Sequence, residues 1–138
     1  MKKVVLLIED SRFARTANER ALTRSGFEVI ATDDGEGAID LAKKNQPDVI
    51  LLDLMLPNIT GVQVLRLLKV DSQTRSIPVI VVSSLSHRNK SALLRDGAAD
   101  MLEKTDDLLR NDSAKLIEAV KKVLTERAAL GRSENGLK

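Results

Sequence analysis

Acidic, hydroxyl and amine side chains follow, or lie just beyond, four of the apolar runs in this sequence. They are Glu9 and Asp10, Asp53, Ser83 and Ser84, and Lys104. Carboxylates bind hard cations and can attack phosphorus as nucleophiles, whereas hydroxyl and ammonium groups donate hydrogen bonds to phosphoryl oxygens. Together these residue types fit phosphoryl transfer, provided that the fold brings them to one place.

Three continuous apolar runs predict strands that are buried on both faces, as in the middle of a parallel sheet. They span residues 4–8, 49–53 and 77–82, while 27–32 alternates like an edge strand and 98–102 is a short fifth strand. Helical patterns follow at residues 11–26, 35–45, 62–70, 86–96 and from Asp112 on. Five such units with right-handed crossovers predict an α/β fold, a doubly wound five-stranded parallel sheet in the order 2-1-3-4-5 with helices on both faces.

The predicted sheet brings the polar residues to one edge, because the carboxyl ends of parallel strands lie on the same side. The first and third strands are neighbours in this order, so the carboxylates of Glu9, Asp10 and Asp53 are expected within a few ångströms of one another. Three carboxylates so close repel one another unless a cation neutralises them, and oxygen ligands suit Mg²⁺. Lys104 adds one more positive charge. Asp53 is then able to act as the nucleophile toward a phosphoryl group.

Four stretches of the sequence resemble a known family. LLIEDS, VILLDLMLPNITG, IPVIVVSS and GAADMLEKT make residues 3 to 127 similar to a single-domain response-regulator receiver of two-component signalling, with a flavodoxin-like fold. The resemblance implies that Glu9, Asp10, Asp53 and the backbone carbonyl of Met55 bind Mg²⁺, that Asp53 is the phosphoacceptor, that Ser83 is the switch hydroxyl and that Lys104 pairs with the phosphoryl oxygens. It implies a sensor histidine kinase or phosphotransfer protein as the donor, and no enzyme activity beyond self-phosphorylation from small donors and self-dephosphorylation.

The sequence departs from the family pattern at three places. Met101 stands where the family usually has an aromatic switch residue, so rotation of a ring cannot be the readout, although a flexible methionine is able to repack. Thr105 replaces a proline that usually follows a cis bond; because a cis bond before threonine would cost about 3 kcal/mol, we expect either trans geometry or a strained loop. Met55 and Leu85 are apolar near the attacking water, from which we expect slow self-dephosphorylation.

Phosphorylation of Asp53 adds charge and acceptor oxygens that Ser83 and Lys104 satisfy only if residues 83–90 move inward. The expected signalling face comprises residues 86–96, 99–102 and 112–124, which are helix 4, strand 5 and helix 5. This face would bind a downstream protein target, or a second copy of the chain in a homodimer. His87 at its start is interpreted as a solvated loop residue. We expect the receiver domain to span residues 1–127, followed by a frayed or disordered tail over 128–138.

The composition excludes several other classes of function. The formal net charge is +2 and no basic tract is interleaved with aromatic residues, which argues against nucleic-acid binding. Cysteine is absent, so there is neither a disulfide nor a thiolate metal site. The first apolar stretch is too short for a signal peptide or a membrane span, so we expect a cytoplasmic protein without membrane contact.

Parts of the sequence also fit other interpretations. Each acid taken alone is also explained by a turn or a solvated helix entry. A phosphatase with two acids two residues apart is disfavoured because Met55 stands at the second position, and GEGAID at 35–40 lacks the third glycine of a dinucleotide-binding loop. The remaining alternative is a degenerate receiver that serves as a docking or dimerisation module without phosphorylation.

Overall fold

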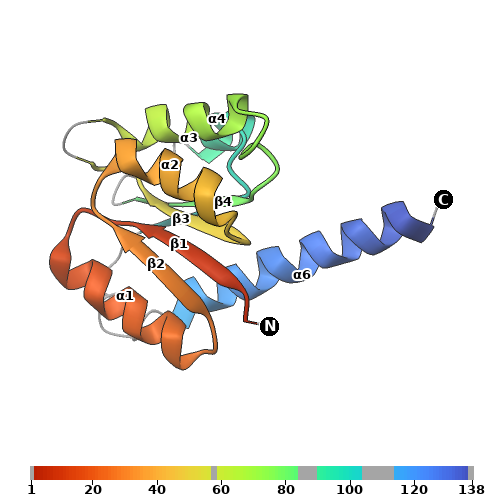
Figure 1. Ribbon diagram of the computed structural model, residues 1–138, viewed down its shortest axis with the longest axis horizontal. Coiled ribbons are helices and arrows are strands. Elements are labelled where there is room, and N and C mark those ends of the chain that lie inside the picture. The colour runs from red at the N-terminus through yellow and green to blue at the C-terminus, as the bar shows by residue number, and fades with distance from the viewer. Residues whose placement is uncertain (1, 57–58, 84–89, 104–113, 137–138) are drawn as a thin grey trace.

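The computed structural model describes residues 2–56, 59–83, 90–103 and 114–136. Its centre is a parallel sheet of five strands in the order β2-β1-β3-β4-β5 (Figure 1). The strands are β1 (Val4–Ile8), β2 (Glu28–Thr32), β3 (Val49–Asp53), β4 (Val79–Ser83) and β5 (Asp100–Glu103). The helices are α1 (Arg12–Arg24), α2 (Gly35–Asn45), α3 (Gly61–Val70), α4 (Lys90–Arg95) and α6 (Ala114–Gly136). The predicted strand order is confirmed.

The three central strands owe their burial to their unbroken apolar sequences. Every residue of β3 and β4 is buried, whereas β2 at the edge of the sheet is exposed or half-buried along its length. β4 begins at Val79, two residues later than predicted, and it continues through Ser83. Because side chains alternate between the faces of a strand, each central strand needs apolar cover on both sides.

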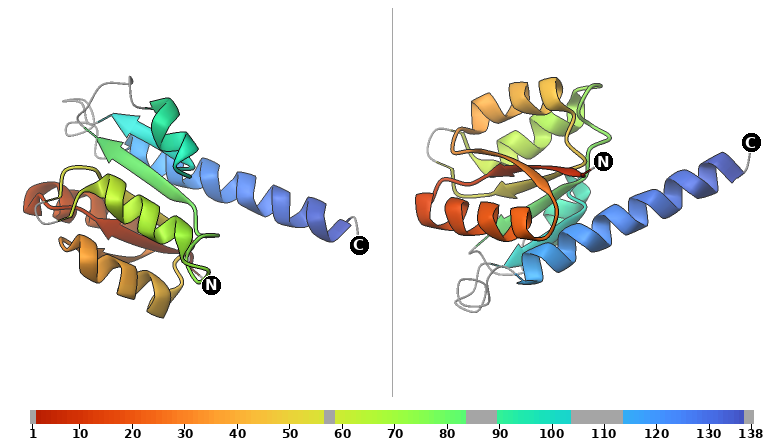
Figure 2. Two further views of the ribbon diagram at one scale, coloured as in Figure 1. Left: turned by 90° about the horizontal axis from the view of Figure 1, so that it is seen from above. Right: turned by 60° about the horizontal axis from the view of Figure 1, so that its bottom comes forward.

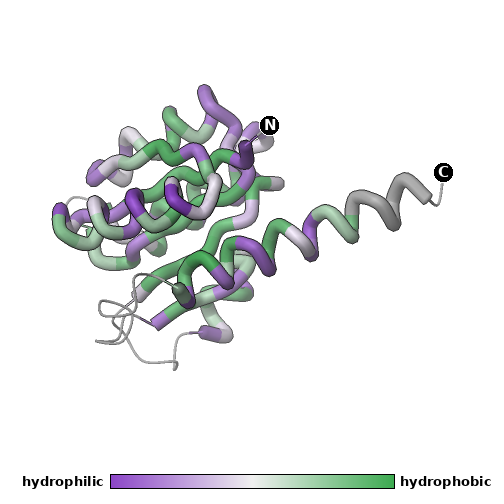
Figure 3. The backbone as a smooth tube through the Cα atoms, turned by 90° about the horizontal axis from the view of Figure 1, so that it is seen from below, coloured by the Kyte–Doolittle hydropathy of each residue, from purple (hydrophilic) through white to green (hydrophobic). Residues whose placement is uncertain are grey.

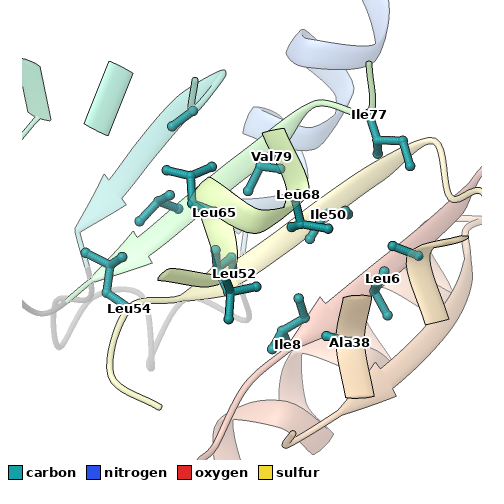
Figure 4. Close-up of a cluster of buried hydrophobic side chains, with 14 of the residues drawn as sticks. Leu6, Ile8, Ala38, Ile50, Leu52, Leu54, Leu65, Leu68, Ile77 and Val79 are labelled. Atoms are coloured by element: carbon teal, nitrogen blue, oxygen red, sulfur yellow. The ribbon is translucent and has the colours of Figure 1, made fainter. Parts of the chain in front are cut away.

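Helices on the two faces of the sheet provide that cover. α2, α3 and α4 lie on one face, and α1 and α6 lie on the other (Figure 1; Figure 2). Figure 4 shows Leu6 and Ile8 of β1 near Ala38 of α2, and Ile50 and Leu52 of β3 near α3. Each fully buried aliphatic side chain of this kind contributes about 1.5–3 kcal/mol relative to an exposed one. The two apolar clusters fix where the strands end, and therefore where their polar residues lie.

Local capping sets the start of the two helices that flank the acidic strand ends. Ser11 is the N-cap of α1, and its hydroxyl accepts a hydrogen bond from the Ala14 N–H at 3.3 Å. Thr60 and Gln63 form a capping box at the start of α3. Caps of this type typically contribute about 1 kcal/mol each, and they end the loop at a defined residue.

The last helix, α6, is longer than the sequence predicts. Its first half packs on the sheet through Leu116, Val120 and Val123, and the Arg127 guanidinium donates a hydrogen bond to the Ser76 carbonyl. Beyond this point the backbone stays helical through Gly136 and extends away from the sheet (Figure 1), where the loss of apolar periodicity predicts a frayed tail. Figure 3 shows apolar residues concentrated in the part of α6 next to the sheet. Among the described residues, no helix is both long enough and apolar enough to cross a membrane.

Candidate functional site

Buried polar side chains gather at one edge of the sheet. Within the described part of the chain, Glu9, Asp53, Thr74 and Ser83 are the buried polar or charged residues. Thr74 belongs to the loop after α3, where its hydroxyl donates to Leu68 O at 2.7 Å. The other three come at the carboxyl ends of β1, β3 and β4, which are neighbours in the sheet. The structure therefore brings Glu9, Asp53 and Ser83 to one place, as predicted from the strand order.

Asp53 is the last residue of β3 and is 5% exposed. It is paired with Val82 of β4, and the following N–H, from Leu54, donates to Val82 O at 3.2 Å. The Oδ1 atom of Asp53 accepts a hydrogen bond from the Met55 N–H at 3.0 Å. This short-range bond orients the carboxylate relative to the loop that follows the strand.

The loop after Asp53 closes against its own start. The Gly61 N–H donates to Leu54 O at 3.0 Å. A Cβ at Gly61 would lie 2.4 Å from the Leu54 Cα and 2.6 Å from the Asp53 carbonyl oxygen, which is closer than real atoms pack. Only a residue without a side chain lets α3 begin this close to the backbone of Asp53.

Glu9 follows β1 and is 2% exposed, while the next residue, Asp10, is exposed. The Glu9 N–H donates to Thr32 O of β2 at 3.0 Å. Glu9 and Asp53 both line a small cavity of about 10 Å³, together with Asn18 of α1. Two acidic residues that are almost fully buried and line one small cavity favour a nearby positive charge, because burial removes their carboxylates from water.

The prediction that three carboxylates converge is realised only in part. Among the residues that the structure describes, no three acidic, histidine or cysteine side chains form a group that could hold a metal ion. Glu9, directly after β1, and Asp53 line one cavity, whereas Asp10, one residue further on, is exposed. The donor chemistry nevertheless fits a hard divalent cation, since the buried ligands are all oxygens.

Some of the remaining predicted residues are described by the structure and others are not. Ser83 ends β4 with no exposed surface, and Met101 of β5 is 4% exposed in the apolar cluster that also contains Leu93 of α4. Met55 is 59% exposed. Ser84, Leu85, His87, Lys104 and Thr105 lie outside the described residues, so their predicted roles stay predictions.

Two residues of α1 near the acids were not identified from the sequence. Arg15 donates from Nη1 to the carbonyl oxygens of Glu9 and Asp10, at 2.9 and 3.3 Å. Asn18 is half-buried at the cavity that Glu9 and Asp53 line. Asn18 could have been found from the sequence, because it is a polar residue on the inward face of α1, between the buried residues Ala14 and Ala21.

The sequence of the chain matches a known protein family. The family model described as the response regulator receiver domain matches residues 5–121. The polar-differentiation response regulator DivK of Brucella anthropi is 35% identical over 100 residues, which cover 72% of this chain and 81% of DivK.

Solved structures agree with the sequence comparison. The signal receiver domain of a LuxO repressor homologue from Vibrio parahaemolyticus superposes with a TM-score of 0.81 and 26% identity, covering 96% of each chain. The Mn²⁺-bound form of the response regulator Rcp1 gives a TM-score of 0.69 and 29% identity, covering 80% of this chain and 89% of Rcp1. The chain belongs to the response regulator receiver domains of two-component signalling, a family of phosphoacceptors that typically bind a divalent metal.

Proposed function

We propose that the chain is a phosphorylation-activated signalling switch that accepts a phosphoryl group on Asp53. The donor is a phosphohistidine on a sensor histidine kinase or a phosphotransfer protein. The observation that carries the proposal is the burial of Glu9, Asp53 and Ser83 at the ends of three adjacent strands. Burying polar groups is costly unless they are satisfied, and these three supply the nucleophile, one metal-binding carboxylate and one hydroxyl donor that the proposed transfer uses.

In the transfer step, a carboxylate oxygen of Asp53 attacks the phosphorus atom and forms an acyl phosphate. The bond from phosphorus to the histidine nitrogen breaks, and its electron pair stays on the imidazole. Glu9, Asp10, Asp53 and the Met55 carbonyl would hold Mg²⁺, which would neutralise negative charge around the phosphoryl group. The Asp53–Met55 hydrogen bond restricts rotation of the attacking carboxylate. Ser83 and Lys104 donate hydrogen bonds to the phosphoryl oxygens.

The signal leaves through the face of α4, β5 and α6. Ser83 is paired with Glu103 of β5, two residues after the buried Met101. A Ser83 hydroxyl that turns toward the phosphoryl group changes the packing next to β5, and an unbranched methionine repacks at low cost. This face then binds a downstream protein target or a second copy of the chain. No contact with nucleic acid or membrane is part of the proposal.

The test is the intact mass of the protein after incubation with acetyl phosphate and Mg²⁺. Asp48 provides a matched control, because it precedes the opposite end of β3 and its carboxylate accepts a hydrogen bond from the Val4 N–H. The wild type and Asp48→Asn should each gain one phosphoryl group, about 80 Da, and Asp53→Asn none. A wild type that gains no mass would support the degenerate receiver, a docking or dimerisation module that works without phosphorylation.

The phosphorylated form is expected to lose its phosphoryl group slowly. The Met55 side chain is 59% exposed beside Asp53 and offers no hydrogen bond to an attacking water molecule. Met55→Asn should therefore shorten the half-life of the acyl phosphate, measured by intact mass over time. An unchanged half-life would show that this side chain does not limit the reaction.

A further inference from the structure

The turn that carries Glu9 and Asp10 is held by hydrogen bonds to its main chain from two sides. The Glu9 N–H donates to Thr32 O of β2 at 3.0 Å. On the other side, Nη1 of Arg15 donates to the carbonyl oxygens of Glu9 and Asp10 at 2.9 and 3.3 Å. Arg15 is half-buried near the start of α1. Its guanidinium ties the backbone of both acids to the helix that follows them.

We propose that Arg15 is a positioning residue for divalent-cation binding, because it fixes the main chain of Glu9 and Asp10 so that their carboxylates meet the cation together with Asp53. The inference rests on the proposed function and assigns a role to a residue outside the ligand set. Hydrogen bonds from a charged donor are about twice as strong as neutral ones. A turn that is already ordered loses less conformational entropy when the cation binds.

The positive charge of Arg15 repels the cation that its hydrogen bonds are proposed to help bind. Whether replacing Arg15 raises or lowers the affinity for the cation therefore distinguishes the two effects. A positive group beside a cation site weakens binding by Coulomb repulsion, and removal of charge alone would strengthen binding. Removal of the two hydrogen bonds frees the turn and weakens binding. Outer partners of metal ligands contribute about 10- to 100-fold in affinity, which exceeds the effect of one charge screened by water and salt. We therefore expect replacement of Arg15 to lower the affinity for the cation.

The test is a titration of the protein with Mn²⁺, followed by the electron paramagnetic resonance signal of the free ion, without any phosphoryl donor. Arg15→Ala removes one charge and both hydrogen bonds. Arg12→Ala removes the same charge from an exposed side chain three residues earlier in α1. Arg15→Ala should bind Mn²⁺ about tenfold more weakly than the wild type, and Arg12→Ala should stay within about twofold of it.

Two more variants separate positioning from loss of structure. Arg15→Met keeps the aliphatic stem but has no donor, and it should bind Mn²⁺ as weakly as Arg15→Ala. Arg15→Lys restores a charged donor and should recover part of the affinity, which a general defect in folding would not allow. If Arg15→Met binds Mn²⁺ as tightly as Arg12→Ala, the inference is overturned while the metal site stands. A wild type that binds no Mn²⁺ overturns the metal part of the proposed function, and this inference with it.

Discussion

Gly61→Ala tests whether the loop after Asp53 determines reactivity. The added Cβ would lie 2.4 Å from the Leu54 Cα and 2.6 Å from the Asp53 carbonyl oxygen. Both atoms belong to the main chain, so no side-chain rotation relieves the overlap. Ordinary contact begins near 3.4 Å, so the start of α3 and the end of β3 must separate by about 1 Å.

Two consequences follow from a shift of this size. Overpacking of a close contact costs about 1–3 kcal/mol in the free energy of unfolding. A misplacement of about 1 Å at a reacting group can lower a rate about 100-fold. We therefore expect Gly61→Ala to fold, to be moderately less stable to urea, and to be phosphorylated about 100-fold more slowly by acetyl phosphate with Mg²⁺.

Gly37→Ala is the matched control. The atoms nearest to its Cβ belong to the side chain of Asp34, which caps α2 by accepting a hydrogen bond from the Glu36 N–H and lies away from the Asp53 backbone. An alanine inside α2 favours the helix by about 0.5–1 kcal/mol, which offsets a weakened cap of about the same size, so this variant should keep the wild-type rate and stay within about 1 kcal/mol of the wild-type stability. A Gly61→Ala protein that reacts at the wild-type rate would refute the reasoning, because the backbone of Asp53 would then tolerate the shift.

Three further predictions concern other parts of the surface and core. Phe13 is 73% exposed at the start of α1, three residues after Asp10, and we expect the proposed phosphohistidine protein to contact it. Phe13→Ala should slow transfer from such a protein about tenfold but not from acetyl phosphate. Val70→Ala, at a residue 77% exposed at the far end of α3, should slow neither. Thr74→Val should lower the free energy of unfolding by about 1–3 kcal/mol in urea, because a buried carbonyl loses its donor, and an altered phosphorylation rate would contradict its structural role. The hydrogen bond from Lys43 lowers the pKa of Asp71, so the stability it adds is present above about pH 4 and is lost as pH falls through the lowered value. The stability difference between the wild type and Asp71→Asn should therefore shrink as the solution is made more acidic than about pH 4, and a difference that grows in acid would contradict this.

The sheet was predictable because strands that are buried on both faces have continuous apolar sequences. Val49 to Leu52 and Val79 to Val82 have no polar residue, and all are buried. The ends of elements were less predictable. Ile77 belongs to the apolar run that predicts a strand, but it lies before β4. The backbone of α6 stays helical beyond Arg127, although the apolar periodicity of its sequence ends there. Periodicity reports packing against the sheet, whereas a helical backbone does not require such packing.

The site was predictable only where strand order determines it. Asp53 and Ser83 end neighbouring strands, and sheet topology alone brings them together. The contacts of Arg15 are made by a long side chain to main-chain carbonyls, and neither partner has a sequence signature. Strand order does not determine how deeply each acid is buried, because Glu9, one residue beyond β1, is buried whereas Asp10, two residues beyond it, is exposed.

The central claim is that Asp53 is the phosphoacceptor, and chemical trapping tests it most directly. Borohydride reduces an acyl phosphate on aspartate to homoserine, which peptide mass spectrometry locates by residue. After treatment with acetyl phosphate and Mg²⁺, homoserine should occur at position 53 alone. Homoserine at Asp10 or Asp48, or a phosphoryl group that resists borohydride because it sits on Ser83, would contradict the account.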